Sequence, residues 1–276
     1  EILGSAVAKK YHNQLPLLAK FIDAKQDLSI QVHPNDEMAK REHNSFGKSE
    51  MWYVIDAEPG AFLYSGFKKH ISPEEYKQRV EDGTITDVLA KHEVHAGDVF
   101  YIPAGRVHAI GKGVFLAEIQ QSSDITYRIF DYKRKDKNGQ ERELHTELAS
   151  QAIDYVVQEE YRTDYSNDAQ CANHCIDSPF FSVRIVEADK PIHRNLLKYD
   201  SFIISMCLKG SCIIRSRKTG GEFLLKEAFS CLIPACDADY DVVPQNGPVR
   251  LLDAFIDNKD CRIFRIFTNF LHLTSK

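Results

Sequence analysis

Residues 97–108 predict a buried strand between two turns, followed by a histidine. Gly97 and Asp98 form a tight-turn pair, and the Val-Phe-Tyr-Ile run after them carries no charge. Such a run is typical of a short strand buried on both faces. Pro-Ala-Gly at 103–105 ends the strand with a turn, and His108 follows three residues later. The pattern predicts a histidine held rigidly just beyond a buried strand, as a metal ligand must be held.

A second copy of this turn lies in the last third of the chain. Residues 231–239 align without gaps on residues 100–108, and both copies contain Ile-Pro-Ala. The position of His108 holds Asp239 in the second copy, so the turn is kept where the histidine is not. We interpret the match as a sign of two related β-barrels, the second of which has lost this candidate ligand.

The composition excludes several classes of function. The chain has 276 residues, of which 43% are hydrophobic, and this length allows two domains. Its net charge of −5 gives no electrostatic basis for binding nucleic acid or an anionic membrane. No apolar run approaches the ~18 residues that a membrane span needs. The seven cysteines are thinly spread and odd in number, which indicates reduced thiols and a cytoplasmic protein.

Alternation and apolar runs bounded by turn residues predict β-strands over most of the chain. The predicted strands lie at residues 28–32, 51–55, 61–64, 99–102, 114–119 and 125–132, and then at 180–186, 202–208, 212–215, 228–233, 240–243 and 249–256. A helix should begin at Ser72, with Pro73 in its first turn and Glu75 completing a capping box. A short helix is predicted at 86–90, and apolar periodicity predicts a linking helix within 145–160.

These elements predict a mainly β protein with two barrel or jelly-roll domains. The first domain, residues 1–143, should contain the candidate metal site and a helical insertion at about 72–91. Residues 144–175 should form a helical linker, and residues 176–276 a second barrel without metal ligands. The residues after Asp257 match no pattern.

Two pairs of polar residues upstream give His108 candidate partners. Gln31 and His33 are two apart on a predicted strand and share one face, as do Lys48 and Glu50. Two imidazoles, a carboxylate and an amide oxygen form a mixed nitrogen and oxygen set that suits zinc or a similar divalent ion. Two neutral imidazoles and one carboxylate leave a net charge of +1 on the ion, enough to polarise a carbonyl. Taken singly, Gln31 and Glu50 are better explained as solvated polar positions of half-buried strands.

Four motifs, in chain order, resemble the signatures of type I mannose-6-phosphate isomerases, most closely the short bacterial form. They are LSIQVHPND at 28–36, GKSEMWY at 47–53, PAGRVHAIG at 103–111 and TYRIFDY at 126–132. The likeness is strong over residues 15–145 and weak in the second barrel. It implies a double cupin that binds one zinc ion per chain and interconverts mannose 6-phosphate and fructose 6-phosphate through a cis-enediol. We therefore expect a sugar phosphate as the small-molecule partner, and a monomer or homodimer.

The resemblance also implies roles for single residues. The metal ligands would be His33, Glu50 and His108, with Gln31 as a fourth. Arg128 matches the catalytic arginine of the family, and Lys48 matches an active-site lysine. Lys20 and Ser29 match positions associated with the substrate phosphate.

Elementary chemistry agrees with these roles but leaves some of them open. A metal ion and Arg128 would both stabilise an enediolate, and a lysine with a strand hydroxyl suits a dianionic phosphate. Glu50 would be a poor base while bound to metal, so a metal-bound water or Asp124 remains a candidate for the proton transfer. Arg128 could instead form a surface ion pair with Asp131 or Asp124, and Lys48 could be a solvated surface residue.

Two other functions fit a cupin. The first is a metal-dependent dioxygenase with iron at the same ligands, although such enzymes usually supply a His-x-His block, which Gln31-Val-His33 lacks. The second is a non-catalytic cupin that binds a sugar or a metal.

Overall fold

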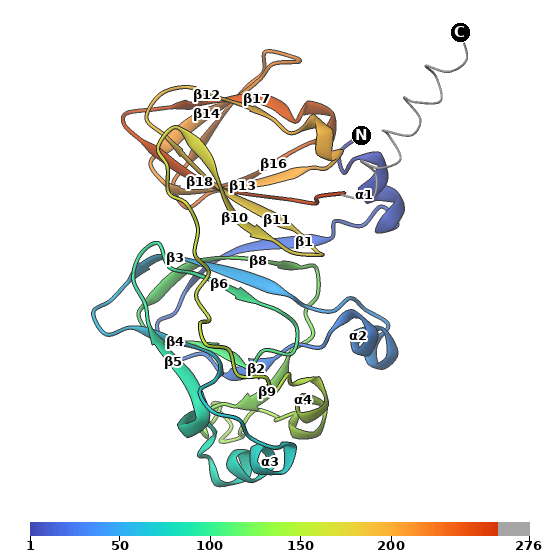
Figure 1. Cartoon of the computed structure of the whole chain (residues 1–276), viewed down its shortest axis with the longest axis vertical. Helices are drawn as coiled ribbons and strands as arrows, with labels where there is room; N and C mark the ends of the chain where they lie inside the picture. Colours follow the sequence, from blue (N-terminus) through green and yellow to red (C-terminus); the bar gives the residue numbers. More distant parts are fainter. Residues whose placement is uncertain (259–276) are drawn as a thin grey trace. The chain divides into compact units, whose positions relative to one another are not determined.

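The computed structural model describes residues 1–258, which form two compact β units (Figure 1). One unit consists of residues 17–164. The other combines residues 1–16 with the chain from residue 165 onward. Both are built from antiparallel sheets, which fits the mainly β protein that the sequence predicts. The sequence predicts no element for the tail that begins at residue 257. The structure describes only residues 257 and 258 of this tail, and the rest of it lies outside the described residues.

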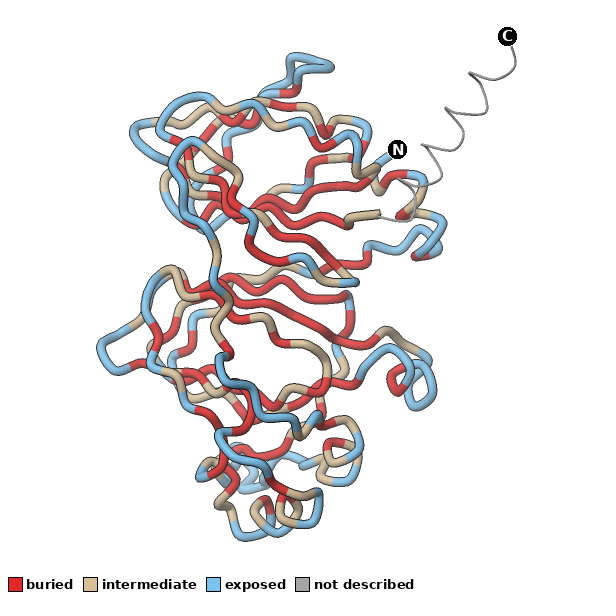
Figure 2. The backbone as a smooth tube through the Cα atoms, in the orientation of Figure 1, coloured by how far each residue is buried: buried red, intermediate tan, exposed pale blue. Residues whose placement is uncertain are grey.

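The unit of residues 17–164 contains two sheets. The four-stranded sheet has the order β1 (Leu17–Asp23), β8 (Val114–Gln121), β3 (Glu50–Ala57) and β6 (Val99–Ile102). The five-stranded sheet has the order β5 (Leu89–Glu93), β4 (Phe62–Phe67), β7 (His108–Ile110), β2 (Ile30–Val32) and β9 (Tyr127–Phe130). The buried residues follow the strands (Figure 2). Both sheets contribute to one core cluster, which joins Trp52 and Leu116 of the four-stranded sheet to Leu63 and Ile110 of the five-stranded sheet.

The helices of this unit are short and connect strands. They are α2 (Asp36–His43), α3 (Pro73–Asp82), the 3-10 turn η1 (Ile85–Val88) and α4 (Thr146–Ala152). The predicted start of α3 is confirmed, since the Ser72 side chain accepts a hydrogen bond from the backbone N–H of Glu75. Gly83 ends it in the left-handed conformation, with φ of 73°.

The other unit also has two sheets, and it includes α1 (Ser5–Lys10). The first sheet has the order β10 (Cys171–Asp177), β11 (Ser182–Ala188), β18 (Val249–Phe255), β13 (Ile203–Lys209) and β16 (Ser230–Ile233). The second has the order β12 (Ile192–Asn195), β17 (Asp239–Pro244), β14 (Ser211–Ser216) and β15 (Glu222–Lys226). The repeated Ile-Pro-Ala turns follow β6 and β16, each the last strand of its sheet.

Two features differ from the sequence prediction. The first sixteen residues group with the second barrel, because the backbone N–H groups of Ala235 and Phe202 donate to the carbonyls of Ile2 and Leu3. The linking helix is shorter than predicted and ends at Ala152. Beyond it the chain is extended and residues 161–163 run along the free edge of β6, where backbone partners are available.

Candidate metal centre

Three predicted ligands meet inside the barrel of residues 17–164. His33 directly follows β2, while Glu50 and His108 are the first residues of β3 and β7. His33 Nε2 lies 3.5 Å from one carboxylate oxygen of Glu50, and His108 Nε2 lies 3.3 Å from the other. All three side chains are buried, and their candidate ligand atoms lie within 4.8 Å of one another.

Backbone carbonyls fix the orientation of both imidazoles. His33 Nδ1 lies 2.9 Å from the carbonyl oxygen of Ile125, and His108 Nδ1 lies 2.8 Å from that of Arg106. A carbonyl only accepts, so each Nδ1 carries a proton and Nε2 is the ring nitrogen that faces Glu50, with its lone pair free to bind a metal when the ring is neutral. Burial lowers the pKa of His108 to about 3 despite the nearby carboxylate, which keeps this ring neutral.

Glu50 is a buried carboxylate whose oxygens, like Nε2 of His33, have no hydrogen-bond partner among the described residues. Burial alone would raise its pKa. The positive charge that the two imidazoles carry when protonated, together with the Lys48 ammonium 3.6 Å away, outweighs burial and holds the pKa of this carboxyl below its usual range. Ligands at 2.0–2.1 Å from a tetrahedral zinc ion lie roughly 3.3 Å apart, close to the nitrogen–oxygen separations in this cluster. The cluster therefore fits a divalent cation.

Gln31 lies next to this cluster. It is the direct partner of His108 in the pairing of β2 with β7, and its Nε2 lies 3.2 Å from His108 Nε2. Rotating the amide by half a turn would exchange this nitrogen for Oε1, so Gln31 can present an acceptor at the same place. The structure thus brings together all four residues of the predicted ligand set.

Arg128 lies one strand away, opposite Gln31 in the pairing of β2 with β9. Its Nη1 donates to the carbonyl of Glu143 at 3.0 Å, and its buried Nε has no partner among the described residues. The alternative of an ion pair with Asp131 or Asp124 is wrong, since Arg128 pairs with neither among the described residues and Asp131 instead pairs with Arg134 and Arg142. Arg128 therefore has hydrogen-bonding capacity left over.

The predicted phosphate residues are not joined by any hydrogen bond in the described chain. Lys20 donates from Nζ to Glu118 Oε1 at 2.9 Å, and its side chain is 39% exposed. Ser29 is buried directly before β2. Lys48 is likewise buried rather than a solvated surface residue.

Sequence reasoning missed two buried polar residues beside the centre. Glu118 accepts hydrogen bonds from Lys20 and from Trp52 Nε1, the second at 3.0 Å. Burial raises the pKa of Glu118, and the nearby Glu50 carboxylate raises it further. Gln120 is the direct partner of Glu50 in the pairing of β3 with β8. The sequence could have revealed both, because Glu118 and Gln120 are two residues apart in an apolar predicted strand, and this spacing places them on one face.

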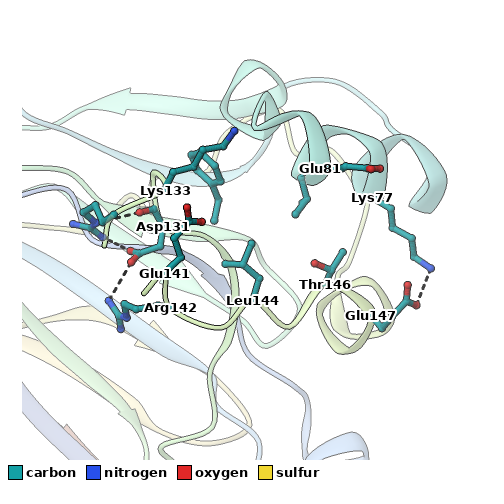
Figure 3. A pocket seen from close by; sticks show the side chains of 12 residues that line it. Lys77, Glu81, Asp131, Lys133, Glu141, Arg142, Leu144, Thr146 and Glu147 are labelled. Atoms are coloured by element: carbon teal, nitrogen blue, oxygen red, sulfur yellow. Dashed lines mark hydrogen bonds and ion pairs between the residues drawn. The ribbon is translucent and has the colours of Figure 1, made fainter. Parts of the chain in front are cut away.

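A separate cavity of about 400 Å³ lies near α3 and α4 (Figure 3). Its charged lining residues are four bases and four acids: Lys77, Lys133, Arg134, Arg142, Glu81, Asp131, Glu141 and Glu147. None of the predicted site residues lines it, and its balanced charges favour no ion of either sign. The candidate chemistry therefore lies in the barrel interior.

Known proteins resemble this chain in both sequence and fold. Residues 1–62 match the family model of the phosphomannose isomerase type I catalytic domain. The chain is 41% identical over 174 residues to mannose-6-phosphate isomerase ManA of Bacillus subtilis (62% of this chain, 55% of the relative). It is 48% identical over 157 residues to the mannose-6-phosphate isomerase of Streptococcus mutans (57% of this chain, 47% of the relative).

A solved structure decides the family. The crystal structure of mannose 6-phosphate isomerase from Bacillus subtilis matches with a TM-score of 0.78 and 30% identity, over 88% of this chain and 76% of that one. The chain belongs to the type I mannose-6-phosphate isomerase family. Membership confirms the mainly β, cupin fold class. The chain spans about half the length of the curated relatives that it matches. Across residues 1–258, no helix is long and apolar enough to cross a membrane.

Proposed function

We propose that this chain is a zinc-dependent isomerase that interconverts mannose 6-phosphate and fructose 6-phosphate through a cis-enediol. The observation that carries the proposal is the buried cluster of His33, Glu50 and His108, in which His33 Nε2 and both Glu50 oxygens have no hydrogen-bond partner among the described residues and face a place that a cation would fill. Gln31 would be the fourth ligand. We propose one ion per chain, because the described residues contain one such cluster.

The reaction moves a proton between C1 and C2 of the sugar while the carbonyl migrates. A bound zinc ion would polarise that carbonyl and stabilise the negative charge of the enediolate. Arg128 would place its unused donors against the same charge, and the buried Lys48 would add a second cation beside Glu50. Two groups are candidates for the base that transfers the proton: a metal-bound water and a second carboxylate, Asp124.

The substrate phosphate would be held by Lys20 and Ser29. Lys20 is partly exposed and already forms an ion pair with Glu118. A bound phosphate would therefore share the Lys20 ammonium with the Glu118 carboxylate. The substrate is a small molecule, and we propose a cytoplasmic site of action. The described cysteines, which are all free thiols, support a reducing compartment.

The test is turnover of mannose 6-phosphate by the purified chain before and after chelation, followed by addition of Zn²⁺. We expect activity to disappear with the chelator and to return with Zn²⁺. A zinc-loaded, folded protein that does not turn over this substrate would refute the isomerase function. Zinc binding without turnover would favour a non-catalytic cupin, and oxygen consumption with iron would favour a dioxygenase.

A further inference from the structure

One buried side-chain amide holds the segment that carries Lys48 and Glu50. Gln121, the last residue of β8, is buried. Its Oε1 accepts a hydrogen bond from the backbone N–H of Ser49 at 2.8 Å, and its own backbone N–H donates to the carbonyl of Ser49 at 3.0 Å. Ser49 stands between Lys48 and Glu50, so Gln121 fixes the backbone from which both side chains project.

The other end of the same amide reaches the segment that follows His33. Gln121 Nε2 donates to Asp36 Oδ1 at 3.0 Å, and the same oxygen accepts from the backbone N–H of Gly47 at 2.8 Å. Asp36 comes three residues after His33, at the start of α2. A single amide and a single carboxylate oxygen thus connect the two ligand-bearing segments.

These two segments approach so closely that position 47 requires glycine. A Cβ at Gly47 would lie 2.5 Å from the backbone nitrogen of Asp36. Residues 46–49 have no regular secondary structure, so no helix or sheet ladder holds them. The segment that leads into Glu50 is therefore held by individual hydrogen bonds: Ser49 N–H donates to Gln121 Oε1, Gly47 N–H to Asp36 Oδ1, Lys48 N–H to the carbonyl of Pro34 at 3.1 Å, and Ala104 N–H to Ser49 Oγ. Glu50 itself begins β3 and is paired with Gln120 and Ile102, so these bonds set how the strand is entered.

We infer that Gln121, together with Asp36, is a positioning residue of the metal centre. It sets the place of Glu50 relative to His33 through the backbone of Ser49, and it touches no ligand atom itself. The inference rests on the proposed metal function and adds to it a residue outside the ligand set. Hydrogen bonds that orient metal ligands typically change metal affinity by about 10- to 100-fold.

The first test removes the amide. Gln121→Leu keeps the approximate volume but leaves Ser49 N–H unpaired, and we expect the affinity for Zn²⁺ to fall roughly 10- to 100-fold in competition with a chelating dye. Circular dichroism should show a folded protein. The matched control is Gln245→Met in the other unit, whose amide donates to the carbonyls of Val243 and Pro244; it should leave Zn²⁺ affinity unchanged. Wild-type affinity in Gln121→Leu would overturn the inference.

The second test does not depend on whether Gln121→Leu folds. Gln121→Glu still accepts from Ser49 but sets a second carboxylate against Asp36, so Zn²⁺ affinity should fall. Asp36→Asn alone should change little, because an amide oxygen still accepts from both donors. The double variant, Gln121→Glu with Asp36→Asn, should recover most of the Zn²⁺ affinity, since the amide introduced at position 36 can donate to the new carboxylate. A double variant whose Zn²⁺ affinity is no higher than that of Gln121→Glu would overturn the inference. Wild-type protein that binds no Zn²⁺ would instead refute the proposed metal function itself.

Discussion

Nε2 of His108 lies 3.3 Å from Oε1 of Glu50, although the two residues begin strands of different sheets. Glu50 begins β3 in the four-stranded sheet, and His108 begins β7 in the five-stranded sheet. The candidate centre therefore spans the interior of the barrel and depends on the packing of both sheets.

Glu50→Gln should nearly abolish metal binding. The substitution keeps the shape of the side chain but removes the one negative charge among the ligands, so we expect Zn²⁺ affinity to fall by at least about 100-fold, the upper end of what orienting residues alone cause. Zinc content after dialysis against a limiting Zn²⁺ buffer measures this. Glu141→Gln, in the charged cavity of Figure 3, is the matched control and should retain zinc. Full zinc content in Glu50→Gln would contradict the proposed ligand set.

Arg128→Ala should lose turnover and keep its metal. The arginine lies one strand from the ligands and has donors to spare, and removal of one donor that stabilises a developing negative charge typically costs about 10²- to 10³-fold in kcat. Steady-state kinetics and zinc analysis on the same sample separate the two effects. Arg142→Ala, which removes an ion pair with Asp131, should retain activity. Zinc lost together with activity would indicate a structural role for Arg128.

Lys20→Met should raise KM for mannose 6-phosphate more than it lowers kcat. A hydrogen bond to a charged group is worth about 1.5–3 kcal/mol, which corresponds to a rise in KM of roughly 10- to 100-fold. The matched control is Lys133→Met, from the separate cavity, which should leave KM unchanged. An unchanged KM in Lys20→Met, with a lower melting temperature, would show that Lys20 serves only to compensate Glu118.

The pH dependence of stability in strongly acidic solution should include a contribution from Asp177. Partial burial raises the pKa of this carboxyl, but hydrogen bonds from Ser182, His174 and Arg184 outweigh it and lower the pKa to about 2, from an ordinary value of 3.8. A depressed pKa stabilises the folded state above the ordinary value, and this contribution is lost as the pH falls from 3.8 to about 2.

The corresponding variant is Asp177→Asn. Its free energy of unfolding at pH 6 should be lower than that of wild type by about 1 kcal/mol. The difference should shrink at pH 2.5, as followed by denaturant titration at both values. Asp189→Asn, at an exposed position, provides the control. If the free energies of unfolding of Asp177→Asn and wild type differ equally at both pH values, the lowered pKa assigned to Asp177 is contradicted.

Local sequence patterns determined much of the fold. The twelve predicted strands all have counterparts in the structure, because their apolar faces are needed to cover a core. Strands such as β12 and β15 escaped prediction. β12 is short and mostly polar, and the three consecutive apolar residues of β15 show no alternation, so the formation of both depends on a neighbouring strand.

The ligand chemistry of the candidate site can be read from the sequence: two imidazoles, a carboxylate and an amide lie on strand ends, in motifs that resemble one isomerase family. The polar residues that surround these ligands are set by the folded structure. Glu118 and Gln121 come from a strand that reads as largely apolar, and they reach the centre through pairing with β1 and β3 and through a bond to Asp36. The bonds from Gln121 join residues 72 and 85 positions apart, so they depend on sheet register, and register is set by the packing of the whole barrel.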